Sequence, residues 1–251
     1  MEVKLENLSF HYNRKKQILK NVTLTLPSGK FTAILGPNGS GKTTLMKQIN
    51  RILTPQAGRI TMNGVDAASM STGDLARTVA YVPQMTGGMM AGSVMDTVML
   101  GRKPYIKWKP SEEDIEIVSN CLMRFHLEGI AQREFNALSG GQKQTVLIAR
   151  ALAQTPRLYL FDEPVSFLDV RNQLEIMTAA RELVDRDGKT VIMVLHDLNM
   201  ALRFADHIVI MKEGNVFAQG APQEVITEEN ILAVYGTHAQ IRNGEYVITS
   251  L

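Results

Sequence analysis

The feature that most constrains this sequence is a glycine-rich segment that directly follows a short apolar run. The run covers residues 31–35, and the next residues are Gly36-Pro37-Asn38-Gly39-Ser40-Gly41-Lys42-Thr43. They fit the pattern G-x-x-x-x-G-K-[ST], and a helical pattern begins at Thr44. In such a loop the backbone N–H groups surround phosphate oxygens, Lys42 reaches the β and γ phosphates, and Thr43 binds Mg2+. The segment through Thr44 therefore predicts a nucleoside triphosphate site between a strand and a helix.

Two adjacent carboxylates follow another apolar run. Asp162 and Glu163 come directly after residues 158–161. Open α/β sheets place their ligands at the carboxyl ends of the strands. We therefore expect Asp162 to hold Mg2+ through its water shell and Glu163 to polarise the attacking water as a general base.

A second potential anion site lies at the start of another helix. There the segment Leu138-Ser139-Gly140-Gly141-Gln142 opens an amphipathic pattern that continues to Ala153. A serine and two glycines at a helix start can bind an anion, but only the first loop has the lysine and threonine that complete a nucleotide site. A two-fold homodimer, in which each Ser139 loop caps the partner's Lys42 loop, would use both anion sites.

Composition narrows the class of protein. With 251 residues, 45% of them hydrophobic and 21% charged, the chain is large enough for a sizeable globular core. The net charge of +2 comes from mixed charges without a basic stripe, so we expect no nucleic-acid partner. The single cysteine, Cys121, excludes an intramolecular disulfide and is expected to be a small core residue in a reducing compartment. Since neither a signal peptide nor a membrane-spanning apolar run is apparent, we expect a cytosolic protein whose membrane role is peripheral.

Hydrophobic periodicity predicts an α/β fold with a parallel sheet. Short apolar runs that end at loops are typical of buried parallel strands, and they cover residues 31–35, 158–161, 191–195 and 208–211. Residues 3–10 and 22–26 alternate apolar with polar side chains, which predicts a small antiparallel layer. Glu213-Gly214-Asn215 is typical of a hairpin turn.

Strand signals are absent between about residues 89 and 153, which predicts a helical insertion. One helix is expected to open at Ser111, with acidic residues in its first turn. Its apolar stripe is predicted to comprise Ile115, Val118, Leu122 and Phe125, with Cys121 beside it. The only tryptophan, Trp108, precedes this helix, and no role is assigned to it.

With its L-S-G-G-Q segment at residues 138–142, the sequence resembles the ABC transporter ATPase family over essentially the whole chain. The resemblance implies a P-loop NTPase fold with a RecA-like core, an antiparallel β subdomain and an inserted α-helical subdomain. It implies one nucleotide-binding domain over residues 1–251, with the catalytic core in 1–88 and 154–251 and the helical signature subdomain in 89–153. ATP and Mg2+ would be the ligands, and the chain would hydrolyse ATP.

Four further positions match family residues individually. Tyr12 matches the aromatic residue that stacks on adenine, and the alternative interpretation is a half-exposed strand tyrosine. Gln84 matches the glutamine that contacts Mg2+ and the attacking water, and His196 matches the histidine that contacts the γ-phosphate and the catalytic carboxylate. Asp169 matches the D-loop residue that crosses the dimer interface. The resemblance thus implies Glu163, His196, Gln84 and Lys42 as the catalytic set.

The sequence departs from the family pattern near the D-loop and the signature. Val165 stands where threonine is common, and Phe167 stands where a smaller residue is usual. Thr145 replaces a common basic residue after the signature. Because none of these departures replaces a catalytic group, hydrolysis is still expected.

Three segments, at residues 100–104, 196–199 and 219–225, resemble importers of iron-siderophore, haem or cobalamin complexes. The resemblance implies transmembrane permease subunits as partners, and through them a substrate-binding protein, at the cytoplasmic face of the cell membrane. The methionine-rich segment from Met85 to Met99 could contact a permease or fill the helical core, and both interpretations stay open. The alternative function is a non-transport ABC ATPase, such as a cluster-assembly or other protein-remodelling ATPase.

Overall fold

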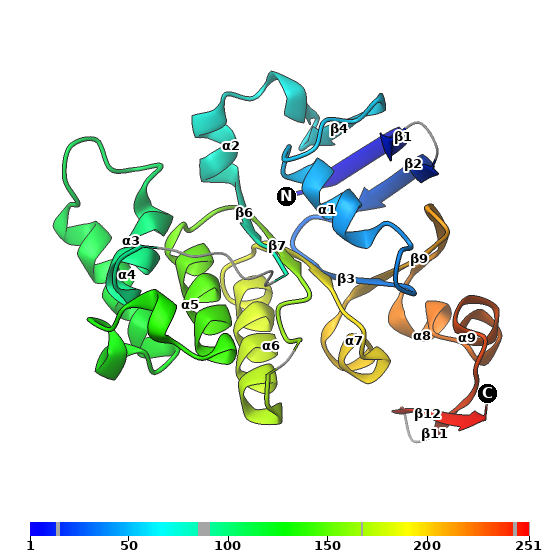
Figure 1. Ribbon diagram of the computed structural model, residues 1–251. Coiled ribbons are helices and arrows are strands. Elements are labelled where there is room, and N and C mark those ends of the chain that lie inside the picture. The colour runs from blue at the N-terminus through cyan, green and yellow to red at the C-terminus, as the bar shows by residue number, and fades with distance from the viewer. Residues whose placement is uncertain (14–15, 85–90, 167, 243–244, 251) are drawn as a thin grey trace. The chain divides into compact units, whose positions relative to one another are not determined.

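A computed structural model describes residues 1–13, 16–84, 91–166, 168–242 and 245–250 (Figure 1). The chain forms two compact units. The first unit comprises residues 1–70 and 180–251, and the second comprises residues 71–179. The division at residues 89 and 153 expected from the sequence is a finer subdivision and stays a prediction.

An antiparallel sheet in the first unit has the strand order β2-β1-β4-β5. Its strands are β1 Val3–Asn13, β2 Lys16–Leu26, β4 Ala57–Met62 and β5 Val65–Asp66. Val3 pairs with Leu26 and Leu5 with Leu24, and all four side chains are buried. Alternate residues of a strand share a face, so this register collects the apolar side chains on one side of the sheet. The predicted antiparallel layer is confirmed.

The parallel part of the first unit surrounds β3. Strand β3 pairs in parallel with β8 on one side and β9 on the other, and the hairpin strand β10 pairs with β9. The bounds are β3 Phe31–Leu35, β8 Thr190–Val194, β9 His207–Lys212 and β10 Asn215–Gly220. Every residue of β3 and β8 is buried, as the continuous apolar runs predicted.

The predicted hairpin turn joins β9 to β10. Glu213 and Gly214 both have positive φ, 49° and 85°, as a two-residue type I′ connection requires. A Cβ at Gly214 would lie 2.4 Å from the Ile18 carbonyl oxygen, so glycine also permits a close approach to β2.

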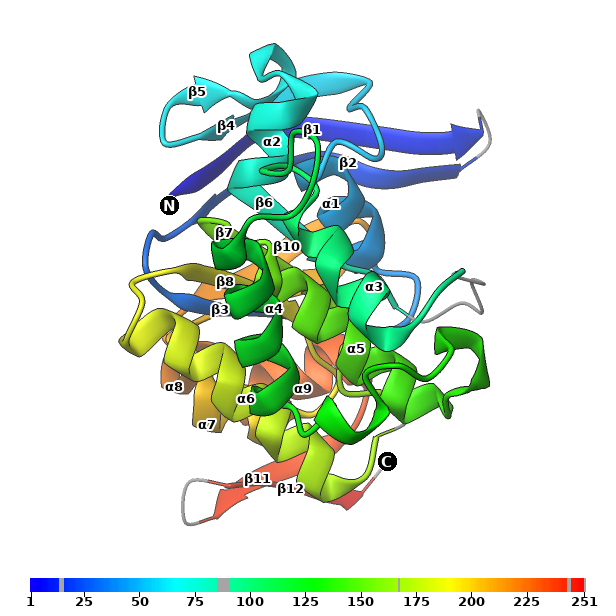
Figure 2. The same cartoon turned by 90° about the vertical axis from the view of Figure 1, so that its left-hand side faces the viewer.

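Helices and a short hairpin complete the first unit (Figures 1 and 2). They are α1 Lys42–Ile49, η1 Ala67–Ser69, α7 Leu198–Phe204, α8 Pro222–Val225, α9 Glu228–Tyr235, β11 His238–Arg242 and β12 Glu245–Ser250. The Asn199 side-chain amide donates to the Tyr246 carbonyl oxygen at 3.1 Å and accepts from the Tyr246 N–H at 2.6 Å. This pair of bonds attaches the C-terminal hairpin to α7. An isolated two-stranded hairpin is at best marginally stable, so the attachment supports it.

The second unit combines a parallel strand pair with a group of helices. Strand β6 Val79–Val82 pairs in parallel with β7 Leu158–Asp162. The helices are α2 Thr72–Thr78, α3 Val94–Met99, η2 Leu100–Arg102, α4 Glu112–Arg124, η3 Glu128–Ile130, η4 Phe135–Ala137 and α5 Gly140–Ala153. Helix α6, Val170–Asp185, runs across the boundary of the two units. Among the described residues, no helix is long and apolar enough to cross a membrane.

Helix α4 opens where the sequence predicted, but its buried face differs from the predicted stripe. Val118, Leu122 and Phe125 are buried, whereas Ile115 is 48% exposed, so that part of the prediction was wrong. The buried residue of the first turn is Asp114. Its neighbour Ile115 is rotated by about 100° around the helix axis, which takes it to the edge of the face.

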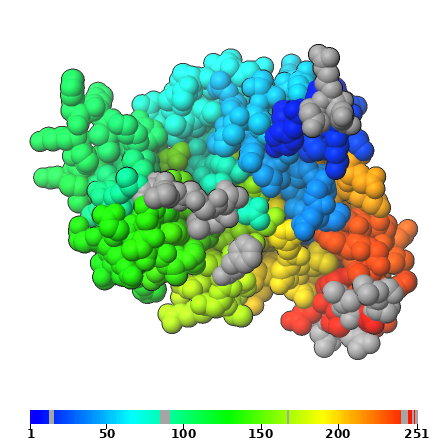
Figure 3. Space-filling model, in the orientation of Figure 1, coloured from blue at the N-terminus to red at the C-terminus, as the bar shows by residue number. Residues whose placement is uncertain are grey.

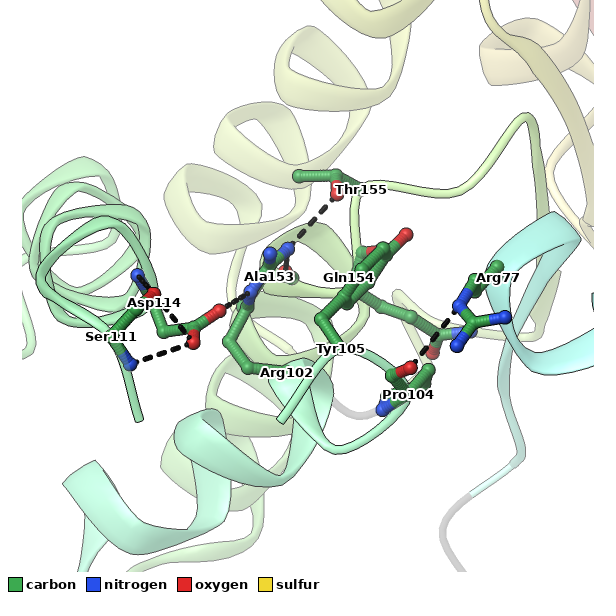
Figure 4. Close-up of polar contacts among 9 residues, drawn as sticks. All are labelled: Arg77, Arg102, Pro104, Tyr105, Ser111, Asp114, Ala153, Gln154 and Thr155. Carbon is green, nitrogen blue, oxygen red and sulfur yellow. Dashed lines mark hydrogen bonds and ion pairs between the residues drawn. The ribbon is translucent and has the colours of Figure 1, made fainter. Parts of the chain in front are cut away.

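Asp114 is buried because it forms an ion pair with Arg102. The Arg102 Nε lies 2.8 Å from Asp114 Oδ1, and the two side chains are only 5% and 6% exposed. Arg102 Nη1 also donates to the Ala153 carbonyl oxygen at 2.9 Å and to Thr155 Oγ1 at 3.0 Å (Figure 4). One arginine thus joins η2, the start of α4 and the end of α5, and the sequence did not predict this connection.

Replacing Arg102 with leucine is expected to lower the free energy of unfolding by about 3 kcal/mol, because Asp114 would stay buried without its partner. Urea denaturation measures this change. The matched control is Arg171→Leu, which removes an ion pair to Glu175 whose arginine side chain is 81% exposed, and the expected loss there is under about 1 kcal/mol. Equal losses in the two variants would contradict the structural role of Arg102.

The pH dependence of the free energy of unfolding is a second test of the ion pair between Arg102 and Asp114. The Ser111 backbone N–H and then Arg102 hold the pKa of Asp114 below its usual range. A carboxyl whose pKa is lower in the folded state stabilises the fold above its unfolded pKa and loses this contribution as the pH falls through its folded pKa. Stability should therefore decline on acidification, and Asp114→Asn should flatten that part of the curve.

Cys121 is buried, and burial raises the pKa of its thiol to about 11. Because the thiolate is the reactive form, about one molecule in a thousand would be ionised at pH 8. We expect a maleimide to label the native protein very slowly and the urea-unfolded protein to completion. Mass spectrometry measures the label at this single cysteine. Fast labelling without urea would contradict the predicted core position.

Candidate nucleotide site

The glycine-rich loop joins the end of β3 to the start of α1, as predicted. Gly36, Gly39 and Gly41 have φ values of 141°, 78° and 104°, a region that side-chain-bearing residues rarely adopt. A Cβ at Gly36 would lie 2.1 Å from the Met211 carbonyl oxygen, and one at Gly41 would lie 2.8 Å from Leu19 Cδ2. Close neighbours therefore require glycine at Gly36 and Gly41, whereas at Gly39 only the positive φ favours it.

Lys42 is buried and folds back over its own loop. Its Nζ donates to the carbonyl oxygens of Gly36 at 2.7 Å and Pro37 at 3.0 Å. The loop therefore holds one cation, beside the start of an eight-residue helix, where backbone N–H groups and the helix dipole favour an anion. Ser40 and Thr44 are buried, Thr43 is half-buried, and Asn38 and Gly39 are exposed.

Tyr12 lies next to this loop. Its hydroxyl is 3.3 Å from Thr44 Oγ1, and its ring meets Phe10 edge to face at a centroid distance of 5.0 Å. The Tyr12 side chain is 59% exposed, so its ring can accept a stacked partner. The position suits both sequence interpretations, and adenine stacking stays a prediction.

His196 lies at the same edge of the sheet as the glycine-rich loop. Strands β3 and β8 are parallel neighbours, and the Leu195 N–H donates to the Ile34 carbonyl oxygen at 3.1 Å, which continues the ladder past β8. His196 is exposed, and the next residue, Asp197, caps α7 by accepting from the N–H groups of Asn199 and Met200. The first unit thus brings Tyr12, the loop and His196 to the carboxyl ends of its strands.

The second unit brings Asp162, Glu163 and Gln84 together. Asp162 is fully buried at the end of β7, and its Oδ2 accepts from the Tyr81 hydroxyl at 3.1 Å. Glu163 Oε2 accepts from Gln84 Nε2 at 2.7 Å. The parallel pairing of β6 with β7 explains this meeting, because both chains leave the pair at one edge. Tyr81, which positions Asp162, received no role from the sequence.

Glu163 has an unusual backbone. Its φ is 53°, which is uncommon for a residue with a side chain and often marks functional sites. The Ser166 hydroxyl also donates to its Oε2, at 3.4 Å. The candidate base is therefore oriented by hydrogen bonds from two side chains.

The signature segment forms the start of α5. Ser139 Oγ accepts from the Gln142 N–H at 3.3 Å, and the Ser139 N–H donates to Gln142 Oε1 at 3.1 Å, which completes a capping box. Leu138 is buried, whereas Ser139 and Gly140 are exposed. The predicted helix start is confirmed, and binding of a partner's nucleotide stays a prediction.

Asp169 caps α6. Its Oδ1 accepts from the Asn172 N–H at 2.8 Å, and its Oδ2 accepts from Asn172 Nδ2 at 3.0 Å. The preceding turn is held by Gln173, whose amide donates to the carbonyl oxygens of Val165 and Leu168. Contact with a partner stays a prediction.

Phe167 lies outside the described residues, as do Met85, Met89 and Met90 of the methionine-rich segment.

Thr145, where the family commonly has a basic residue, makes a bond within its own helix. Its hydroxyl donates to the Gly141 carbonyl oxygen at 3.1 Å. This bond lies one turn after the start of α5, so Thr145 belongs to the local structure of the signature helix.

Mg2+ is predicted to bind Thr43, Gln84 and Asp162. A hydroxyl, an amide oxygen and a carboxylate are the oxygen donors that this hard cation prefers, with water for the remaining positions. The Asp162 carboxylate is buried at the end of β7, and a buried carboxylate suits a cation as its partner. Among the described residues no group of three or more His, Cys, Asp or Glu could hold a metal, so such a site would depend on these mixed ligands.

A parallel α/β sheet with a glycine-rich phosphate loop defines the class of P-loop nucleotide-hydrolysing proteins. Comparison with known proteins identifies the family. A family model described as "ABC transporter" matches residues 19–166. The chain therefore belongs to the ABC transporter family, and it is an ATP-binding, ATP-hydrolysing cassette of that family.

Three curated relatives extend the match to nearly the whole chain. An uncharacterized ABC transporter ATP-binding protein of Methanocaldococcus jannaschii is 44% identical over 97% of this chain and 94% of the relative. A hemin import ATP-binding protein of Rhizobium meliloti is 41% identical over 90% and 88%. An iron(3+)-hydroxamate import ATP-binding protein of Bacillus subtilis is 37% identical over 94% and 88%.

A solved structure supports the same assignment. A dimeric ATP-binding cassette in a post-hydrolysis state, bound to ADP and Pi, is 32% identical with a TM-score of 0.79. The match covers 88% of this chain and 98% of that cassette. The predicted α/β P-loop NTPase fold and the predicted ATPase activity are confirmed.

Gly36→Ala is expected to weaken ATP binding at least about a hundredfold, because its Cβ would overlap Met211 and force the loop to shift. The matched control is Gly39→Ala, which also has positive φ but has no heavy atom within 4 Å of the added Cβ. Backbone strain alone costs about 1 kcal/mol, so the control should lose less than about tenfold. Isothermal titration calorimetry measures both, and equal affinities would contradict the steric argument.

Proposed function

We propose that this cassette powers the import of an iron complex, such as a ferric siderophore or haem, or of a similar metal complex such as cobalamin. It would act as a homodimer on the cytoplasmic face of the cell membrane, attached to transmembrane permease subunits that receive cargo from a substrate-binding protein. The relatives named for hemin and iron(3+)-hydroxamate import, 41% and 37% identical over most of both chains, support this cargo class.

The observation that carries the catalytic part is the 2.7 Å hydrogen bond from Gln84 Nε2 to Glu163 Oε2. Because Gln84 donates through its nitrogen, its carbonyl oxygen stays available for Mg2+ or for the attacking water. Glu163 is a carboxylate and can accept a proton from the attacking water. The pair therefore supplies both the base and a group that orients the nucleophile.

The remaining residues would bind ATP and stabilise charge. Tyr12 would stack on the adenine, the loop from Gly36 to Thr44 would surround the phosphates, and Lys42 would neutralise charge that develops at the γ-phosphate. His196 would donate a hydrogen bond to that phosphate. When bound through Thr43, Gln84 and Asp162, Mg2+ would neutralise the β and γ phosphate oxygens.

Each active site would be shared between two subunits. The capping box at Ser139 presents an exposed helix start of the kind that accepts anions, and Ser139 with Gly140 and Gly141 would cover the nucleotide bound to the partner's loop. Asp169 would lie close to the same interface. ATP binding would thereby close the dimer, and loss of phosphate would reopen it.

The non-transport alternative is not favoured, because the three curated relatives are all named for transport or import. The methionine-rich segment from Met85 to Met99 would then belong to the part of the cassette that meets the permease.

Glu163→Gln should lower ATP turnover by at least about a hundredfold while ATP binding persists, because the amide cannot accept the proton from water. Purified Glu163→Gln protein should shift from monomer to dimer on addition of ATP and Mg2+, as measured by analytical ultracentrifugation. Adding Ser139→Arg should abolish the shift. Glu116→Gln, on the exposed side of α4, is the matched control and should turn over normally.

Two outcomes would contradict these assignments. Retained turnover in Glu163→Gln would exclude Glu163 as the base. ATP binding without dimer formation at any accessible concentration would exclude a dimer that closes without the permease.

A further inference from the structure

The only tryptophan of the chain is almost completely exposed. Trp108 is 98% exposed and lies between η2 and α4 in the second unit. A tryptophan offers 150–250 Å² of largely apolar surface, about 25 cal/mol per Å² of which is recovered on burial. An indole held this far out in water is therefore a candidate contact with another phase or molecule.

The loop that carries Trp108, residues 103–110, is held firmly at its base. The Tyr105 hydroxyl donates to the Gln154 carbonyl oxygen at 3.1 Å, and the Tyr105 ring lies under the Arg102 guanidinium at 4.1 Å. Arg77 Nε donates to the Pro104 carbonyl oxygen at 3.1 Å. Figure 4 shows these contacts around the buried Arg102–Asp114 pair. Its anchored base lets the loop present its tip at low entropic cost.

Three lysines lie in the same loop as Trp108. Lys103, Lys107 and Lys109 are all exposed, and the last two flank Trp108 directly. Together with Ser111, Lys107 and Lys109 also line a cleft of about 550 Å³ between the loop and the start of α4. In Figures 1 and 3 the green segment between α3 and α4 projects from the neighbouring helices of this unit.

The acidic groups that follow these lysines along the chain belong to the first turn of α4. Glu112 and Glu113 are exposed, and Glu113 also lines the cleft. Asp114 is already paired with Arg102. Both glutamates lie at a helix N-terminus, where the helix dipole offsets part of their charge. The tip itself, from Lys107 to Lys109, carries only positive charge.

We propose that the loop of residues 103–110 binds the surface of an anionic lipid bilayer, with Trp108 at the level of the headgroups and Lys107 and Lys109 against their phosphates. Indole rings concentrate at this depth because one part is apolar and the N–H is polar. Lysines can extend apolar stems into the interface and keep their ammonium groups beside the phosphates. The inference rests on the membrane location of the proposed function.

A bilayer suits this loop better than a protein partner does. Protein interfaces bury aromatic anchors in pockets and are depleted in lysine. Here a single exposed ring stands between two lysines, and interfacial membrane anchors likewise combine tryptophan with lysine. Adsorption through this loop would hold the cassette at the membrane and restrict its orientation toward a permease.

Because Trp108 is the only tryptophan, its fluorescence reports on the proposed contact without a label. The full-length protein is mixed with vesicles of phosphatidylcholine alone or of phosphatidylcholine and phosphatidylglycerol in about equal amounts. The expected result is a blue-shifted emission, protection from iodide quenching and co-sedimentation with the anionic vesicles only. High salt should weaken the binding because it screens the lysines.

Lys107→Glu with Lys109→Glu should reduce partition into the anionic vesicles by at least about tenfold, since each lysine near such a surface contributes roughly fivefold. Trp108→Ala should reduce co-sedimentation by a similar factor. The matched control carries the same charge reversals at the exposed Lys16 and Lys20 of β2 and should bind like the original protein. ATP turnover of the detergent-free protein is measured in parallel, so a failure of the ATPase assignment is seen separately.

Absence of both the fluorescence shift and co-sedimentation with anionic vesicles would overturn the proposal. A shift that requires a permease in the vesicles and is independent of anionic lipid would also overturn it, and would assign Trp108 to a protein contact. If the control with charge reversals at Lys16 and Lys20 loses vesicle binding equally, binding depends only on the net charge of the protein. That result would exclude a specific role of the loop.

Discussion

The parallel pairing of β3 with β8 is the interaction on which the nucleotide-binding edge of the first unit depends. Both strands are fully buried, and their ladder continues to the Leu195–Ile34 hydrogen bond. The phosphate loop and His196 therefore leave the sheet at one edge, although they are far apart in the sequence. Apolar burial holds this edge in place, which allows the loops beyond it to be polar and, at Gly36, tightly constrained.

Several residues at or beside the predicted site positions also stabilise local structure. Ser139 closes a capping box, Asp169 caps α6, and Asp197 beside His196 caps α7. Such a cap contributes about 1 kcal/mol to its helix, so substitution at these positions changes helix stability together with any contact to nucleotide. Gln84 and Glu163 differ, because their hydrogen bond joins two loops and belongs to no helix end.

The segment at residues 100–104 shows that resemblance to importers need not reflect contact with cargo. Gly101 lies against α5, where an added Cβ would be 2.2 Å from the Arg150 carbonyl oxygen, and Arg102 joins three elements through its guanidinium. These packing requirements account for glycine and arginine at the two positions. Arg102 also contacts the Tyr105 ring in the loop that exposes Trp108. The same side chain therefore forms the buried ion pair and holds the loop of the proposed membrane contact.

The sequence by itself determined the buried strands β3, β7, β8 and β9, whose predicted ends agree with the structure to within one residue, and the starts of α4 and α5, because apolar runs and capping residues act locally. The alternating strands β1 and β2 were predicted shorter than they are, at residues 3–10 and 22–26. The glycine pattern likewise determined the phosphate loop. Only the tertiary structure decided that Asp114 is buried and Ile115 exposed, since the partner Arg102 comes from another element. It also brought Gln84 to Glu163, because strand pairing between distant segments sets which loops meet.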